Sequence, residues 1–168
     1  PNTVKFLSEQ LEAKKVGMVF NSGEQNSRAQ VDSVKKEAKN AGITIVEASA
    51  STSAEVKQAT ESLVGKVDAI YIITDNTVVS ALESVLDVAN DKKIPVMVGE
   101  LDSVARGGLG AYGFSYYDIG YEAGQKAVEI LKDGKKPADI PVAYPANLKL
   151  EINKTTADKI GVNIKDEW

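Results

Sequence analysis

The chain has 168 residues, of which 43% are hydrophobic and 26% are charged, a composition typical of a globular protein with one sizeable core. It contains no Cys and no His, which excludes disulfides, thiolate metal sites, Ser-His-Asp triads and HExxH zinc sites, and leaves Asp, Glu, Lys and Tyr as candidate acid–base catalysts. The net charge is −4 and the basic residues are scattered among acidic ones, so no nucleic-acid partner is expected.

Strand-like and helix-like patterns alternate through the first two thirds of the chain. After an amphipathic opening at residues 4–14, strands are predicted at 16–20, 43–48, 68–73, 95–98 and 109–114. Helices are predicted between them at 27–40, 53–64, 77–90 and 102–106. This alternation predicts an α/β, Rossmann-like fold, with a parallel sheet in the flavodoxin-like order 2-1-3-4-5 and helices on both faces.

The last third of the chain has a looser pattern. A long helix is predicted at residues 116–132 and ends before Gly134. A proline-containing loop at 135–145, a short strand at 148–152 and a helix at 154–160 follow. The long helix carries an apolar stripe at roughly helical spacing, which needs a covering surface.

One glycine motif resembles a nucleotide-binding fingerprint. Residues 108–113 read GLGAYG and match GxGxxG. The fingerprint belongs between the first strand and the first helix of a dinucleotide-binding unit, whereas these glycines lie in or before the fifth strand. We therefore interpret the match as coincidental, and neither a cofactor nor a metal is expected.

Polar residues gather where the first and third predicted strands end. Five follow the first strand, and three follow the third: Asn21, Ser22, Glu24, Asn26 and Ser27, then Thr74, Asp75 and Asn76. Ligands of open α/β sheets bind where strands end and helices begin. Asn, Ser and Asp also cap helices, so capping and ligand binding remain alternative explanations for each residue.

Two further junctions add candidate residues. Glu100 directly follows the fourth strand, a position that we interpret as less typical of a cap. Its carboxylate suits an ammonium, an amide or a sugar hydroxyl, and a salt bridge to Arg106 is the competing explanation. Phe114 and Tyr117 flank the start of the long helix, where they can stack on a planar ligand, line a hinge or pack into the core.

Several of these segments together resemble the type I periplasmic binding protein superfamily. The resemblance rests on residues 16–27, 63–71, 74–82, 94–96 and 113–120. Within the superfamily the chain is similar to the substrate-binding lipoproteins of ABC transporters that include tryptophan- and phenylalanine-binding members.

The resemblance implies one lobe of a two-lobed protein. Residues 1–168 would form a single α/β lobe, the C-terminal one, with 115–168 as the hinge-crossing and C-terminal segment. It also implies a non-enzymatic solute-binding role in an ABC importer, with an amino acid, preferably aromatic, bound between lobes. The family's contact positions would be matched by Asn26, Thr74, Asp75 and Glu100, and its hinge crossing by Phe114 or Ser115. An ABC permease would be the protein partner.

The same resemblance implies an extracytoplasmic protein, periplasmic or held at the cell surface by a lipid-modified N-terminus that this chain lacks. Because the long helix would pack on the absent lobe, we expect it either to fold back on its own sheet or to pair with a second copy in a domain-swapped dimer. Two other functions remain open: a stand-alone flavodoxin-like sensor domain, and an enzyme using Glu100 and Asp75.

Overall fold

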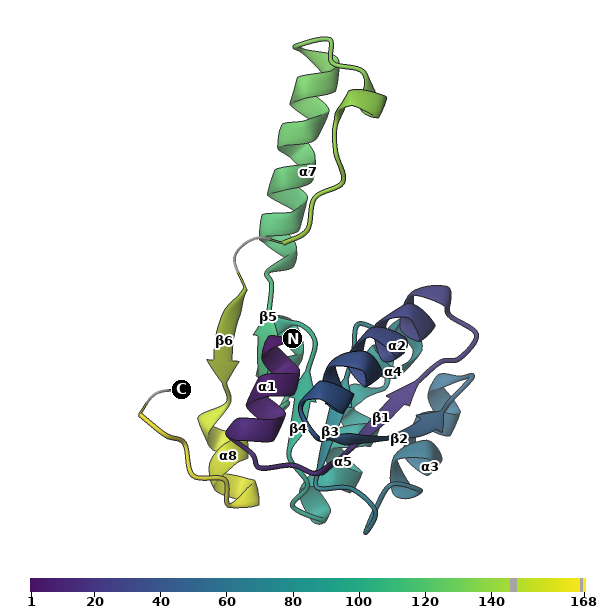
Figure 1. Ribbon diagram of the computed structural model, residues 1–168, viewed down its shortest axis with the longest axis vertical. Coiled ribbons are helices and arrows are strands. Elements are labelled where there is room, and N and C mark those ends of the chain that lie inside the picture. Colours follow the sequence, from purple (N-terminus) through teal and green to yellow (C-terminus); the bar gives the residue numbers. More distant parts are fainter. Residues whose placement is uncertain (146–147, 167) are drawn as a thin grey trace.

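A sheet in the order β2-β1-β3-β4-β5-β6 organises the computed structural model, which describes residues 1–145, 148–166 and 168 (Figure 1). Its strands are β1 (Lys15–Phe20), β2 (Thr44–Ser49), β3 (Ala69–Ile72), β4 (Val96–Val98), β5 (Gly110–Gly113) and β6 (Lys149–Ile152). The first five strands are parallel, and β6 runs antiparallel to β5 at the edge. The predicted α/β fold and the order 2-1-3-4-5 are confirmed, and β6 extends the sheet.

Helices cover both faces of the sheet. They are α1 (Asn2–Glu9), α2 (Gln25–Asn40), α3 (Val56–Glu61), α4 (Asn76–Ser80), α5 (Leu82–Asp91), α6 (Leu101–Ala105), α7 (Tyr116–Leu131) and α8 (Lys154–Ile160), with short 3₁₀ turns at Ser53–Glu55 and Pro137–Asp139. The single helix predicted at 77–90 was wrong, because the chain breaks at Ala81 into α4 and α5. The hydroxyl of Ser80 donates to the carbonyl of Thr77 at 2.8 Å, a contact that competes with the helical ladder.

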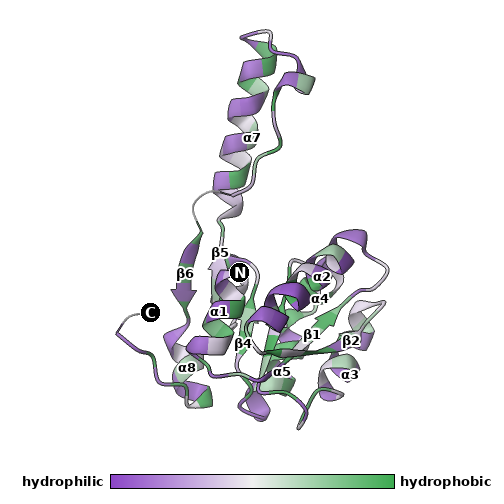
Figure 2. Cartoon of the chain, in the orientation of Figure 1, coloured by the Kyte–Doolittle hydropathy of each residue, from purple (hydrophilic) through white to green (hydrophobic). Residues whose placement is uncertain are grey.

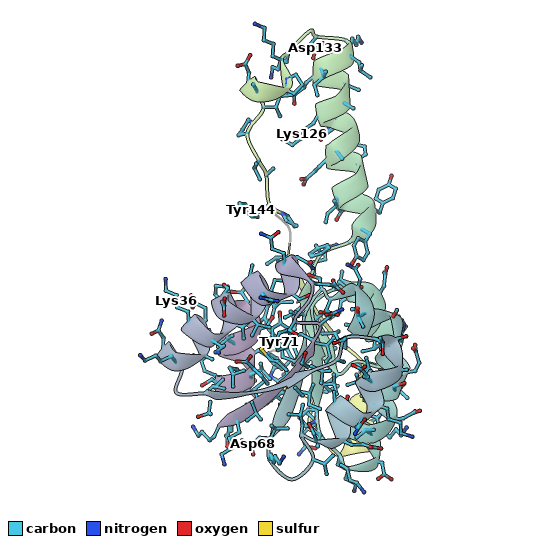
Figure 3. All side chains as sticks on the ribbon, turned by 90° about the vertical axis from the view of Figure 1, so that its right-hand side faces the viewer. Lys36, Asp68, Tyr71, Lys126, Asp133 and Tyr144 are labelled. Carbon is cyan, nitrogen blue, oxygen red and sulfur yellow. The ribbon has the colours of Figure 1, made fainter. Side chains whose placement is uncertain are left out.

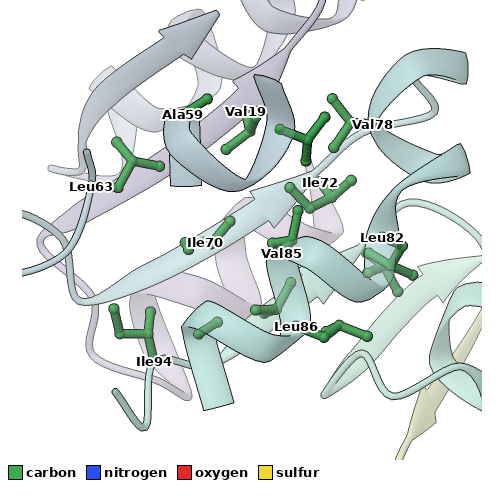
Figure 4. Close-up of a cluster of buried hydrophobic side chains, with 14 of the residues drawn as sticks. Val19, Ala59, Leu63, Ile70, Ile72, Val78, Leu82, Val85, Leu86 and Ile94 are labelled. Atoms are coloured by element: carbon green, nitrogen blue, oxygen red, sulfur yellow. The ribbon is translucent and has the colours of Figure 1, made fainter. Parts of the chain in front are cut away.

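The core lies on both sides of the sheet because successive residues of a strand face opposite ways. In β3, Ile70 and Ile72 pack against α3, α4 and α5, as Figure 4 shows. Ala69, on the other face, packs in the cluster that also contains residues of α1 and α8. The hydropathy colouring of Figure 2 shows the apolar strands enclosed by helices with polar outer faces.

Helix α7 projects from the sheet as an arm (Figure 1). None of its residues is buried, and Tyr117 and Leu131 are 78% and 85% exposed. The chain returns through residues 137–145 beside α7, where Lys126 donates to the carbonyl of Pro141 at 3.4 Å. Of the two expected arrangements, α7 does not fold back on its own sheet. Among the described residues, no helix has the length and apolar character needed to cross a membrane.

The structure shows which carboxylate pairs with Arg106. Its guanidinium forms two hydrogen bonds of 2.8 Å with the Glu83 carboxylate, so the salt bridge considered between Arg106 and Glu100 was wrong. The hydrogen bond from Arg106 lowers the pKa of Glu83 to about 2. The ion pair therefore joins α5 to the residue that follows α6.

We expect Arg106→Gln to raise the pKa of Glu83 towards its ordinary value, because the charged donor is lost. Since the folded-state pKa is depressed, the stabilisation from this pair is present above that value and is lost as the pH falls towards 2. Carboxyl ¹³C NMR titration of both proteins measures the shift. Lys92→Gln, which removes a different exposed ion pair on Asp91, should leave the Glu83 titration unchanged.

Candidate functional site

The loops that follow β1, β3 and β4 meet at one edge of the sheet, because these three strands are parallel and adjacent. Gly99, after β4, lies so close to the chain after β3 that a Cβ there would stand 3.2 Å from the backbone nitrogen of Thr74. The predicted polar residues after the three strands are therefore brought to the same edge. We call this region the carboxyl edge.

Asp75 lies at the centre of the carboxyl edge and is fully buried. Its Oδ1 accepts from the backbone N–H of Val78 at 2.9 Å and caps α4, while its Oδ2 accepts from the backbone N–H of Asn21 at 2.7 Å. The capping explanation for Asp75 is therefore correct. The same carboxylate also ties the loop after β1 to the loop after β3.

Glu24 makes a second connection between these loops. Its Oε2 accepts from the backbone and side-chain nitrogens of Asn76, and its Oε1 accepts from the backbone N–H and hydroxyl of Thr77, at distances of 2.8–3.3 Å. Desolvation would raise the pKa of Glu24, but the hydrogen bonds from Thr77 and Asn76 together outweigh it and hold the pKa below its ordinary value.

Asn21 is also engaged within the carboxyl edge. Its Nδ2 donates to the Thr77 hydroxyl at 2.9 Å, and its Oδ1 accepts from the N–H of Gly23 at 2.8 Å. Thr77 was not among the predicted residues, although it stands next to them in the sequence. Asn21, Glu24, Asp75, Asn76 and Thr77 thus form one hydrogen-bonded network, which we call the loop network.

Thr74 and Asn26 form a second, more open group. The Thr74 hydroxyl donates to Oε1 of Gln30 at 2.8 Å, and the Thr74 carbonyl accepts from the side-chain amides of Asn26 and Gln30 at 3.3 Å each. The Asn26 residue is exposed and Thr74 is half-buried. Gln30 was missed, but its position one helical turn after Asn26 is a signal that could have found it.

Ser27 does not face the open edge. It is fully buried in the first turn of α2, and its hydroxyl has no hydrogen-bond partner among the described residues. The sequence placed the start of α2 at Ser27, whereas the helix begins two residues earlier, at Gln25. In a helix that begins at Gln25, Ser27 lies on the same face as Val31, four residues later, and both side chains are buried.

Glu100 caps α6, so its interpretation as less typical of a cap was wrong. It is 2% exposed, and both carboxylate oxygens accept from the N–H of Ser103 at 3.0 and 3.1 Å. The Ser103 hydroxyl also donates to Oε1. The spacing Glu-x-x-Ser places the carboxylate over the orphan N–H groups of the first turn, which explains the capping geometry.

The aromatic residues at the start of α7 divide into two pairs. Phe114 is half-buried and meets Tyr116 edge to face, with ring centroids 5.5 Å apart. Tyr117 stacks on Tyr121 along the arm, 6.5 Å between centroids. Burial, helped by the charges of Glu100 and Asp102, raises the pKa of Tyr116. The carboxyl edge is therefore continuous with Phe114 and Tyr116, while Tyr117 lies on the exposed arm.

The arrangement presents side-chain groups that can bind the polar atoms of a ligand. Among the described residues, no three Asp or Glu side chains are grouped as metal ligands. Asp75 and Glu100 are each engaged by N–H donors of helix first turns. The fold is a Rossmann-like α/β sheet with polar loops at the carboxyl ends of its parallel strands, where ligands of such sheets bind.

Comparison with known proteins identifies the family. The model of the ABC transporter substrate binding protein family matches residues 3–168, and the chain belongs to this family. A curated relative, the tyrosine-binding protein of Clostridioides difficile, is 45% identical over 144 residues, which cover 86% of this chain and 41% of that protein. The resemblance to substrate-binding proteins of ABC transporters is thus confirmed.

Solved structures agree with this assignment. A conserved domain protein from Vibrio cholerae is 37% identical with a TM-score of 0.93, over 99% of this chain and 56% of that one. An ABC domain in complex with L-Trp from Streptococcus pneumonia is 30% identical with a TM-score of 0.89, over 98% of this chain and 56% of that one. The chain therefore spans about half the length of these relatives.

Proposed function

We propose that this chain is one lobe of the solute-binding component of an ABC importer and that it binds an amino acid, preferably aromatic, against a second lobe. The observation that carries the proposal is the polar carboxyl edge next to a helix, α7, that has no buried residue of its own. A lobe of a two-lobed protein has both features: a half-site at its cleft and a crossing segment that packs elsewhere.

In the proposed arrangement, residues 1–168 form one lobe, with 115–168 as the hinge-crossing and C-terminal segment. The arm α7 would pack its exposed apolar residues on the second lobe. Ligand binding would close the two lobes by hinge motion at Phe114 and Ser115, and the permease would recognise the closed form. The protein would act outside the cytoplasm, anchored through a lipid-modified N-terminus.

An amino acid is supported by the relatives and by the charge of the carboxyl edge. One relative is named a tyrosine-binding protein, and another structure holds L-Trp. Glu24, Asp75 and Glu100 place three carboxylates at this edge, which favours the α-ammonium of a ligand. Asn26, Thr74 and Asn76 would hold polar atoms, and Phe114 or Tyr117 would stack on the ring.

A binding role agrees better with the site than catalysis does. A general acid or base needs a titratable group that can reach the substrate. Asp75 and Glu100 instead accept hydrogen bonds from helix first turns. We therefore propose that the chain is not an enzyme.

Calorimetric titration of this chain with L-tyrosine, L-tryptophan, L-phenylalanine, L-aspartate and glycine tests the proposal. We expect saturable heat with at least one aromatic amino acid and none with aspartate or glycine. Asn26→Ala should weaken that binding about tenfold, because one hydrogen bond to the ligand is lost. Asn163→Ala, an exposed amide that follows α8, is the matched control and should bind as the unmodified chain does. Equal heats for all five amino acids would contradict the proposal.

A further inference from the structure

Glu24 occupies the N-cap position of α2 but does not cap that helix. Its backbone has the extended conformation of a cap residue, with φ −86° and ψ 122°, yet its side chain makes no hydrogen bond to the first turn of α2. Both carboxylate oxygens are turned to Asn76 and Thr77, the first two residues of α4. The Glu24 carboxylate therefore caps α4, the helix that follows β3, and not α2.

The first turn of α4 is consequently held by two carboxylates from two positions. Glu24 accepts from the N–H groups of Asn76 and Thr77, and Asp75 accepts from the N–H of Val78. Three of the four N–H groups that a helix leaves without internal partners are thus satisfied by side chains. Glu24 reaches two of them from the loop after β1, and together with the contacts of Asn21 with Asp75 and Thr77 it holds that loop against the start of α4.

We infer that Glu24 is a positioning residue for ligand binding: its carboxylate holds the loop after β1 against the start of α4 and thereby sets the separation of Asn26 and Thr74. This inference rests on the proposed function for the ligand, whereas the contact between the loops stands without it. Asn26 lies two residues after Glu24, and Thr74 lies two residues before Asn76, so a shift of either loop moves one of the two. Hydrogen bonds to a charged acceptor are about twice as strong as neutral ones, which gives this contact the strength to fix the spacing.

Asp68 provides a matched control at the opposite edge of the sheet. Its Oδ2 accepts from the backbone N–H groups of Lys14 and Lys15, both at 2.8 Å, and these hydrogen bonds lower its pKa. Like Glu24, it is a solvent-accessible carboxylate that joins two segments distant in the sequence. It precedes β3, whereas the loop network follows β3, and Figure 3 shows it at the end of the molecule far from the arm.

Two variants of the full chain, Glu24→Gln and Asp68→Asn, test the inference by amide hydrogen exchange and by calorimetry with L-tyrosine and L-tryptophan as probes. A neutral amide keeps the size of the side chain but loses one acceptor oxygen and the charge. For Glu24→Gln we expect exchange at Asn76 and Thr77 to accelerate about tenfold and the dissociation constant of the bound probe to rise about tenfold. Asp68→Asn should change neither the exchange at Asn76 and Thr77 nor the dissociation constant. We expect it to lower the melting temperature by about as much as Glu24→Gln does.

Unchanged exchange at Asn76 and Thr77 in Glu24→Gln would overturn the inference, and so would faster exchange with unchanged affinity. An equal loss of affinity in Asp68→Asn would also overturn it, because the effect would then follow from stability alone. If the unmodified chain binds neither probe, the proposed function fails instead. The exchange measurement still decides whether Glu24 holds the loops together.

Discussion

Replacing Asp75 with alanine is expected to lower the free energy of unfolding by about 3 kcal/mol. The change removes the cap of α4, which contributes about 1 kcal/mol at a typical N-terminus. It also leaves the backbone N–H of Asn21 without its acceptor in a partly buried position, which costs a further 1–3 kcal/mol or so.

Urea unfolding, followed by circular dichroism, measures the free energy of unfolding of Asp75→Ala and of the unmodified chain. The control is Ser115→Ala, which removes the cap of α7 at an exposed site, where the hydroxyl accepts from the N–H of Tyr117 at 3.2 Å. That variant should lose less than about 1 kcal/mol. Equal losses in the two proteins would show that the contact between Asp75 and Asn21 contributes no stability.

Gly110→Ala is expected to destabilise the protein by about 2–3 kcal/mol through crowding. Gly110 lies in β5 between β4 and β6, and a Cβ there would stand 2.7 Å from the carbonyl oxygen of Glu151. It would also stand 2.6 Å from Cδ1 of Ile152. The side chain can rotate away, but the carbonyl belongs to the backbone of β6, so the edge strand itself must move.

Gly120→Ala is the matched control for this glycine. Gly120 lies in the exposed helix α7, and among the described residues no atom outside its own helix segment lies within 4 Å of a Cβ placed there. Alanine there should stabilise the chain by up to about 1 kcal/mol, because it has the higher helix propensity. Thermal melts of the two variants should therefore shift in opposite directions. A Gly110→Ala protein that melts with the unmodified chain would contradict the close packing of β5 on β6.

The strand order could be predicted because it depends on a pattern that the sequence displays. Strands rich in Val and Ile alternate with amphipathic helices, and short connections between them leave few topologies. The break at Ala81 was not predictable in the same way. Leu82, Val85, Leu86 and Ala89 continue the apolar spacing of one helix, and the contact of Ser80 with Thr77 that disturbs it gives no periodic signal.

The location of the candidate site was also predictable, but the partners of its residues were not. That Asp75 and Glu24 follow parallel strands is visible in the sequence, and it places them at one edge. Which helix each carboxylate caps depends on distances between loops more than 50 residues apart in the chain, as in the contact of Glu24 with Thr77. Glu100 could have been assigned, because Ser103 stands at the spacing of a cap.

The exposure of α7 has a consequence for the helix–coil equilibrium of the arm. A helix of 16 residues is marginal in water without tertiary contacts, and Gly120 and Gly124 each cost it about 1 kcal/mol relative to alanine. The arm should therefore fray in the isolated chain and become fully helical when a complementary surface covers it. Docking would then be coupled to helix formation, and part of the interaction free energy would offset the cost of ordering the arm. The affinity of the arm for that surface would therefore decrease with temperature more steeply than the affinity of a preformed helix.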